Sequence, residues 1–164
     1  MKVFIVKKEN EDKKEYEEQI LGKEERISIN KKEKFNYIVI KNPADSNNIC
    51  TIEDIKVLNK DIPNKMWLMG GEEEELYEEV FEILDESTIG DKIGGVFSIK
   101  TKNESEEDNK KLEIKRNELL KNEECSILND SVLIILPNGC LFIKLDKEVN
   151  DFYMNINWTS EEIN

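Results

Sequence analysis

The sequence predicts a single α+β domain, residues 1–164, in which a mostly antiparallel sheet with a C-terminal β-meander is combined with two to three helices. Three observations predict this class. The chain has 164 residues, the usual size of one domain. Short runs rich in β-branched and aromatic residues recur along it and are densest after residue 131. Two longer stretches, 72–86 and 106–124, instead carry helical spacing or a helix-capping signal.

The first two thirds of the chain are expected to contain both strands and helices. Runs of apolar, β-branched or alternating residues predict strands at 2–7, 27–29, 35–41, 49–58 and 95–101. The polar NKKEK at 30–34 is interpreted as a hairpin connection, and NPADSNN at 42–48 as a loop. Residues 11–21 predict a short helix that ends at Gly22. Ser105 followed by Asp108 fits a helix cap, so a surface helix is expected over 106–124.

The C-terminal third has the strongest strand pattern. Two apolar runs, 131–136 and 140–145, are separated by Pro-Asn-Gly, which predicts a hairpin whose turn uses a positive φ at Gly139. The first of these runs is apolar on both parities, as in a central strand covered on both faces. Apolar and polar residues then alternate over 152–159, which predicts a further strand with one wet face.

Several classes of function are excluded by what the chain lacks. It contains no histidine, which excludes Ser-His-Asp and Cys-His catalysis and histidine-based zinc or iron sites. Cys50, Cys125 and Cys140 are odd in number and show no CxxC spacing, which favours reduced thiols and a cytoplasmic location. No apolar run approaches the roughly 20 residues of a membrane-spanning helix. We therefore expect no catalytic residues, no cofactor, no bound metal and no membrane partner.

The net charge is unevenly distributed. The 37 acidic and 24 basic residues give −13, which would repel nucleic acid from direct binding. Residues 65–91 hold ten acidic side chains and a single lysine, so −9 of the total lies in this short stretch. At 100° per residue, a helix over 72–86 has its apolar residues on one half and its acids, except Glu73, on the other. Like-charged neighbours on that face cost about 1–2 kcal/mol in total.

This acidic face is the candidate site. The predicted partner-binding residues are Glu72, Glu74, Glu75, Glu78, Glu79, Glu82, Asp85 and Glu86, together with Trp67 just before them. A helix of this length presents about one charge per 2.5 Å, close to the roughly 1.7–3.4 Å spacing of phosphates in nucleic acid. The apolar run 66–69 is interpreted as the hydrophobic edge of the same interface.

The leading hypothesis is a non-enzymatic, acidic protein-binding module. It would act as an inhibitor or immunity-type protein that mimics nucleic acid and occupies the basic surface of a nucleic-acid-acting enzyme. Three other interpretations stay open: a solvated face that only keeps the protein in solution, a structural or accessory subunit of a larger assembly, and a small enzyme or nucleotide-binding domain that uses Asp or Glu chemistry.

Overall fold

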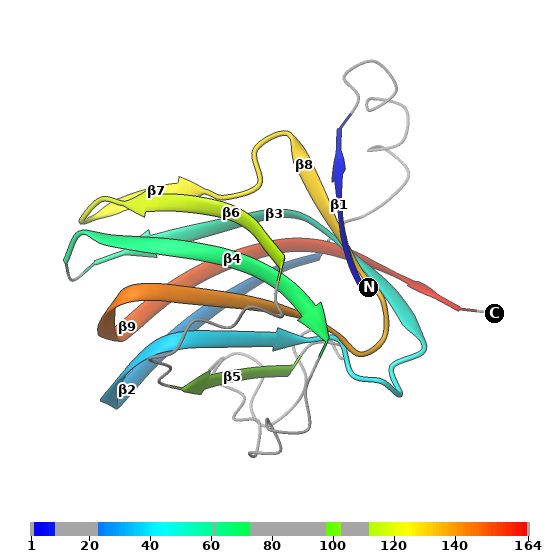
Figure 1. Ribbon diagram of the computed structural model, residues 1–164, viewed down its shortest axis with the longest axis horizontal. Coiled ribbons are helices and arrows are strands. Elements are labelled where there is room, and N and C mark those ends of the chain that lie inside the picture. Colours follow the sequence, from blue (N-terminus) through cyan, green and yellow to red (C-terminus); the bar gives the residue numbers. More distant parts are fainter. Residues whose placement is uncertain (1, 9–22, 61, 73–97, 103–111, 164) are drawn as a thin grey trace.

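The computed structural model describes residues 2–8, 23–60, 62–72, 98–102 and 112–163, and these ranges form one antiparallel sheet (Figure 1). Its strands are β1 (Val3–Lys7), β2 (Lys23–Lys41), β3 (Asn48–Asn59), β4 (Asn64–Glu72), β5 (Ser98–Lys102), β6 (Leu112–Leu119), β7 (Glu123–Ser126), β8 (Ser131–Ile135) and β9 (Gly139–Glu162). No helix occurs in these ranges, so the α+β prediction is wrong. None of the described segments is therefore a helix able to span a membrane.

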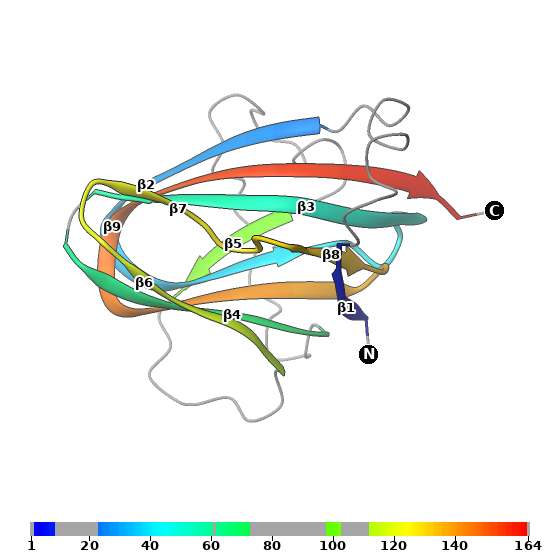
Figure 2. The same cartoon turned by 90° about the horizontal axis from the view of Figure 1, so that it is seen from above.

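The 24-residue strand β9 organises the sheet. It pairs with β2 along most of its length, with β4 through residues 139–145 and with β3 through residues 153–162. The strand order is β1-β8-β3-β9-β2-β5, with β6 added to β4 and β7 added to β3. Because β2 and β9 bend together, with register shifts between Asn30 and Tyr37, the sheet curls back on itself into a nearly closed barrel (Figure 2).

The bend divides the sheet into two layers. Layer A comprises β6, β4, the first part of β9, the second part of β2, and β5. Layer B comprises β1, β8, β3, β7, the second part of β9 and the first part of β2. The two layers share the long β2–β9 ribbon, and their inner faces enclose the main core.

Alternation along the strands fills this core. In β9 the predicted alternation holds, since Phe152, Met154, Ile156 and Trp158 are all buried while the residues between them are half-buried. The fully buried inner side chains of the other long strands are Ile27, Ile29, Ile38, Ile40, Ile52, Ile55, Val57, Met66 and Leu68. A second, smaller cluster lies on the outer face of layer A, because its members have the opposite parity in β2 and β9: Tyr37, Val39, Cys140 and Phe142.

The side chains of two buried asparagines hydrogen-bond to the backbone of segments that are distant in sequence. Asn42 Nδ2 donates to the carbonyls of Asn48 and Ile135, at 2.9 and 3.1 Å. Asn64 Oδ1 accepts from the backbone N–H groups of Lys65 and Lys147, both at 2.9 Å, and its Nδ2 donates to the Lys147 carbonyl at 3.0 Å. Since Lys147 lies in the bend of β9, Asn64 ties the start of β4 to that bend.

The turn before β9 is formed differently from the prediction. Asn138, at φ 71°, takes the left-handed conformation predicted for Gly139. Gly139 is required for space, because an added Cβ would lie 2.7 Å from the Lys2 carbonyl oxygen. The turn carries the chain from layer B to layer A, so β8 pairs with β1 and β3 instead of with β9. The predicted C-terminal hairpin and β-meander are therefore wrong, although the strand at 131–135 does have neighbours on both sides.

Pairing between strands also corrects several other predicted elements. The predicted connection at 30–34 lies inside β2, and the predicted strands at 140–145 and 152–159 are parts of β9. Polar residues at these points mark a bend, which long paired strands accommodate by a shift of register. Of the predicted helix 106–124, the described residues 112–124 instead form β6, the turn at 120–122 and the start of β7. Pairing of β6 with β4 decides the conformation of residues 112–119. Residues 106–111, with most of the capping signal, lie outside the described ranges.

The remaining predictions divide into confirmed strands and residues that are not described. The strands at 2–7 and 49–58 and the loop at 42–48 are confirmed. The strand at 95–101 is confirmed from Ser98 onward. The helix at 11–21 and residues 73–86 of the acidic helix lie outside the described ranges, and the first residue of that helix, Glu72, belongs to β4.

Candidate partner-binding surface

The structure describes two of the nine predicted site residues. Trp67 and Glu72 both lie in β4, about 17 Å apart along the strand at roughly 3.4 Å per residue. The other seven lie outside the described ranges: Glu74, Glu75, Glu78, Glu79, Glu82, Asp85 and Glu86. The acidic face itself thus stays a prediction, while its attachment to the sheet is observed.

The described strands hold both ends of the acidic segment. Residues 73–97 follow Glu72, which pairs with Gly139 of β9, and precede Ser98, which pairs with Lys41 of β2. Cys140 of β9 pairs with Lys41 of β2. The two ends of the segment therefore lie on the first and last of four consecutive strands of layer A, β4, β9, β2 and β5. At about 4.8 Å per strand the ends are roughly 14 Å apart across the sheet. The segment therefore leaves and rejoins the sheet at the same end of layer A.

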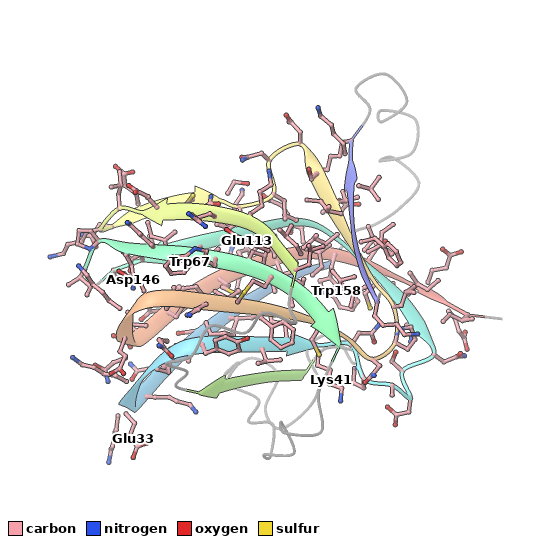
Figure 3. The ribbon with its side chains drawn as sticks, viewed as in Figure 1. Glu33, Lys41, Trp67, Glu113, Asp146 and Trp158 are labelled. Carbon is pink, nitrogen blue, oxygen red and sulfur yellow. The ribbon has the colours of Figure 1, made fainter. Side chains whose placement is uncertain are left out.

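Trp67 lies on the outer face of layer A, in the strand next to the edge strand β6. In the register of the sheet it is opposite Arg116 of β6 and Lys144 of β9. The Arg116 guanidinium carbon is 6.0 Å from the centroid of the Trp67 ring, at the outer limit of a cation-π contact. Arg116 also makes a two-pronged ion pair with Glu113, in which Nε and Nη2 donate to Oε1 and Oε2 at 3.0 and 3.4 Å. Figure 3 labels Glu113 on β6 and Trp67 on the neighbouring strand β4.

This arrangement corrects the interpretation of residues 66–69 as one apolar edge. Met66 and Leu68 are fully buried in the main core, because they point to the inner face of β4. Trp67 and Met69 point to the outer face, where Met69 packs against the small cluster that contains Phe142. Around Trp67 the described surface thus consists of a half-buried indole and an arginine whose charge is neutralised by Glu113.

A hollow on the outer face of layer B was not predicted. It has a volume of about 280 Å³ and lies where β2, β9, β3 and β7 run side by side. Its lining residues are Arg26, Ile27, Ser28, Lys56, Leu58, Glu124, Tyr153, Met154 and Asn155. The ammonium of Lys60 lies 4.4 Å from the centroid of the Tyr153 ring, a close cation-π contact.

Polar contacts at the rim of this hollow are well formed. Asn155 Nδ2 donates to Glu24 Oε1 at 2.7 Å, and Arg26 Nε lies 3.5 Å from the same oxygen. The hydrogen bond from Asn155, with a smaller contribution from Arg26, holds the pKa of Glu24 below its usual value. Asn155 Oδ1 is buried and has no hydrogen-bond partner. The alternation of Tyr153 and Asn155 predicted that this face of β9 is solvent-exposed. It could not predict the hollow, because the other strands that line it are distant in sequence.

The described residues contain no group of three or more Cys, Asp or Glu side chains arranged to hold a metal ion. No disulfide joins the three cysteines, of which Cys50 and Cys140 are buried in the sheet.

Comparison with known proteins gives no relative. No protein-family model matches the chain, and neither a curated protein nor a solved structure is significantly similar to it. Any function must therefore be argued from the residues of this chain.

Proposed function

We propose that this chain is a non-enzymatic, cytoplasmic binding protein that presents the acidic residues 72–86 to a basic surface of a partner protein. The supporting observation is the concentration of charge, with −9 of the net −13 within residues 65–91. Neighbouring stretches of the same chain mix lysines among their acids, so a charge of one sign was not imposed by composition. The partner class is a nucleic-acid-acting enzyme, whose basic groove matches this charge density.

The attachment of the acidic segment supports the proposal. Glu72 and Ser98, at the last position of β4 and the first of β5, are fixed by pairing with β9 and β2. A segment anchored at both ends loses less conformational entropy on binding than a free tail of the same length. Both attachment points lie at the same end of layer A.

The proposal is tested by charge reversal in the segment against a matched reversal elsewhere. The triple variant Glu75→Lys, Glu79→Lys and Glu82→Lys changes the net charge by +6. The control, Glu118→Lys, Glu148→Lys and Glu161→Lys, makes the same change at exposed residues on the sheet. Both proteins are assayed as competitors of duplex DNA for purified basic nucleases and polymerases of the host, at about 50 and 200 mM salt.

We expect the segment variant to associate at least 10-fold more slowly at low salt and the control to change less than 3-fold, because only the first removes the local field. At the higher salt concentration the association rate of the wild type should fall close to that of the segment variant. If the two variants slow association equally, net charge alone is responsible. The acidic residues then act only as a solvated surface, and the proposal fails.

A further inference from the structure

Strand β1 forms one edge of the sheet. It pairs antiparallel with β8, with Phe4 opposite Ile134 and Val6 opposite Val132. Among the described residues no strand pairs with its other side. Figure 1 shows β1 at the end of the barrel, standing across the direction of the long strands. Only its first residue, Val3, is buried, and it packs near Gly70 of β4.

The ladder shows which backbone groups face away from β8. Lys8 N–H donates to the Asp130 carbonyl at 2.6 Å, and Leu136 N–H donates to the Lys2 carbonyl at 2.9 Å. Backbone groups of successive residues in a strand point alternately to its two sides, so the even-numbered residues of β1 are bonded to β8. The N–H and C=O groups of Ile5 and Lys7 therefore point to the side where no described strand lies.

This edge is apolar on both faces and exposed. Phe4, Ile5 and Val6 are 42, 43 and 44% exposed, three consecutive large apolar side chains in one strand. Phe4 and Val6 share the face of Ile134, and Ile5 lies on the opposite face. Natural proteins usually protect such an edge, because it is a template for another strand. An added strand would cover apolar side chains on both of its faces.

The charges of β1 indicate what kind of strand it accepts. Residues 2–8 contain Lys2, Lys7 and Lys8 and no acidic residue. In a second copy paired antiparallel so that Phe4 to Val6 of both chains are covered, Ile5 lies opposite Ile5 and Lys8 opposite Lys2. Like charges directly opposite each other destabilise a strand pair, and this occurs at both ends of such a dimer. A strand with acidic ends forms favourable pairs at the same positions.

We propose that β1 is a docking edge for an extended segment of a partner protein that has an apolar centre and acidic ends. The segment adds to the sheet antiparallel to β1, through the backbone groups of Ile5 and Lys7, and its apolar side chains cover those of Phe4, Ile5 and Val6. The docking edge is separate from residues 72–86, so it goes beyond the function proposed above and does not depend on it.

The test uses the full chain and a defined probe, the peptide acetyl-Glu-Thr-Val-Ile-Val-Thr-Glu-amide. At saturating peptide we expect the amide hydrogen exchange of Ile5 and Lys7, followed by NMR, to slow at least 10-fold. The amides of Phe4 and Val6 are bonded to β8 already and should change less than 3-fold. A peptide with lysines in place of its two glutamates should bind at least 5-fold more weakly, and one with a central proline should not bind.

Variants of the protein separate the edge from the fold. Ile5→Pro removes one outward N–H and no hydrogen bond to β8, and edge strands tolerate proline. Ile5→Glu keeps the backbone but opposes an acidic partner, so it tests the same point if the proline variant fails to fold. Both should weaken peptide binding more than 10-fold. The matched control is Leu112→Glu on β6, which changes another exposed aliphatic residue, 53% exposed, to the same acid and should alter binding less than 2-fold.

Three results would overturn the proposal. The first is exchange protection of Ile5 and Lys7 in the monomer without peptide, which would mean that the edge is already occupied. The second is a concentration-dependent dimer that protects the same amides, which would make a second copy the occupant. The third is equal binding of the acidic and lysine peptides, or none by either. The variant with reversed charges at Glu75, Glu79 and Glu82 should bind the peptide as the wild type does. Failure of the function proposed above therefore leaves this test intact.

Discussion

Asn64 is the side chain that joins the start of β4 to the bend of β9, and its removal tests how that bend is held. Asn64→Ala deletes three hydrogen bonds, two accepted from backbone N–H groups and one donated to the Lys147 carbonyl. At about 0.5–1.5 kcal/mol each, the loss of unfolding free energy should be about 2–4 kcal/mol. For a domain of this size, about 2–4 °C per kcal/mol predicts a fall in Tm of about 4–16 °C.

The assay is urea unfolding at 25 °C together with amide exchange at Lys147, where opening of the clamp should raise the exchange rate at least 10-fold. The control is Asn30→Ala, an exposed asparagine in β2 with an expected effect within about 0.5 kcal/mol. If Asn64→Ala is as mild as the control, or if Lys147 exchanges as in the wild type, the bend is held by strand pairing alone and the reasoning is refuted.

Three further predictions concern packing and charge. Gly139→Ala should destabilise the protein by about 2 kcal/mol or more in thermal unfolding, because the new Cβ meets two backbone oxygens at 2.7 and 2.9 Å, whereas Gly70→Ala meets side-chain atoms at 3.1 Å and should cost less; equal losses would contradict this. Phe142→Ala should cost about 3–5 kcal/mol in denaturant unfolding, and a loss below about 1 kcal/mol would show that the outer cluster is not closely packed. Asn155→Ala should raise the pKa of Glu24 in an NMR titration, more than Arg26→Ala does. An unchanged Glu24 pKa in Asn155→Ala would exclude the hydrogen bond as the cause of the lowered pKa. Because the pKa of Glu24 is lowered in the folded state, Glu24 stabilises the fold above its unfolded pKa, and this stabilisation is lost as the pH falls through the folded pKa.

Local alternation was a sound guide to which residues enter the core. The pattern over 152–158 predicted the buried side chains of β9 correctly, and Trp158 is among the largest buried side chains. The same pattern could not show where a strand ends. Polar residues interrupt β2 at 30–34 and β9 at 146–148, which resembles a connection when only neighbours in sequence are considered. Pairing of the two strands with each other carries both of them through the bend.

The candidate sites show the same limit. The position of Trp67 on a strand would predict its face by parity alone, but its neighbours Arg116 and Lys144 come from strands about 50 and 80 residues away. The hollow around Tyr153 likewise needs four strands that no local pattern brings together. The exposed edge of β1 follows from its pairing with β8, which the predicted hairpin of residues 131–145 did not reveal.

The amino-acid sequence by itself determined the charge distribution, the absence of histidine and the inward or outward face of most strand residues. These are properties of composition and of a two-residue repeat. Only the tertiary structure decided that β8 leaves its sequence neighbour for β1 and β3, that β9 serves three partner strands, and that β1 is left with one unpaired side among the described residues. The physical reason is that strand pairing is made by hydrogen bonds between residues distant in the chain, and a strand's own residues specify its faces but not its neighbours.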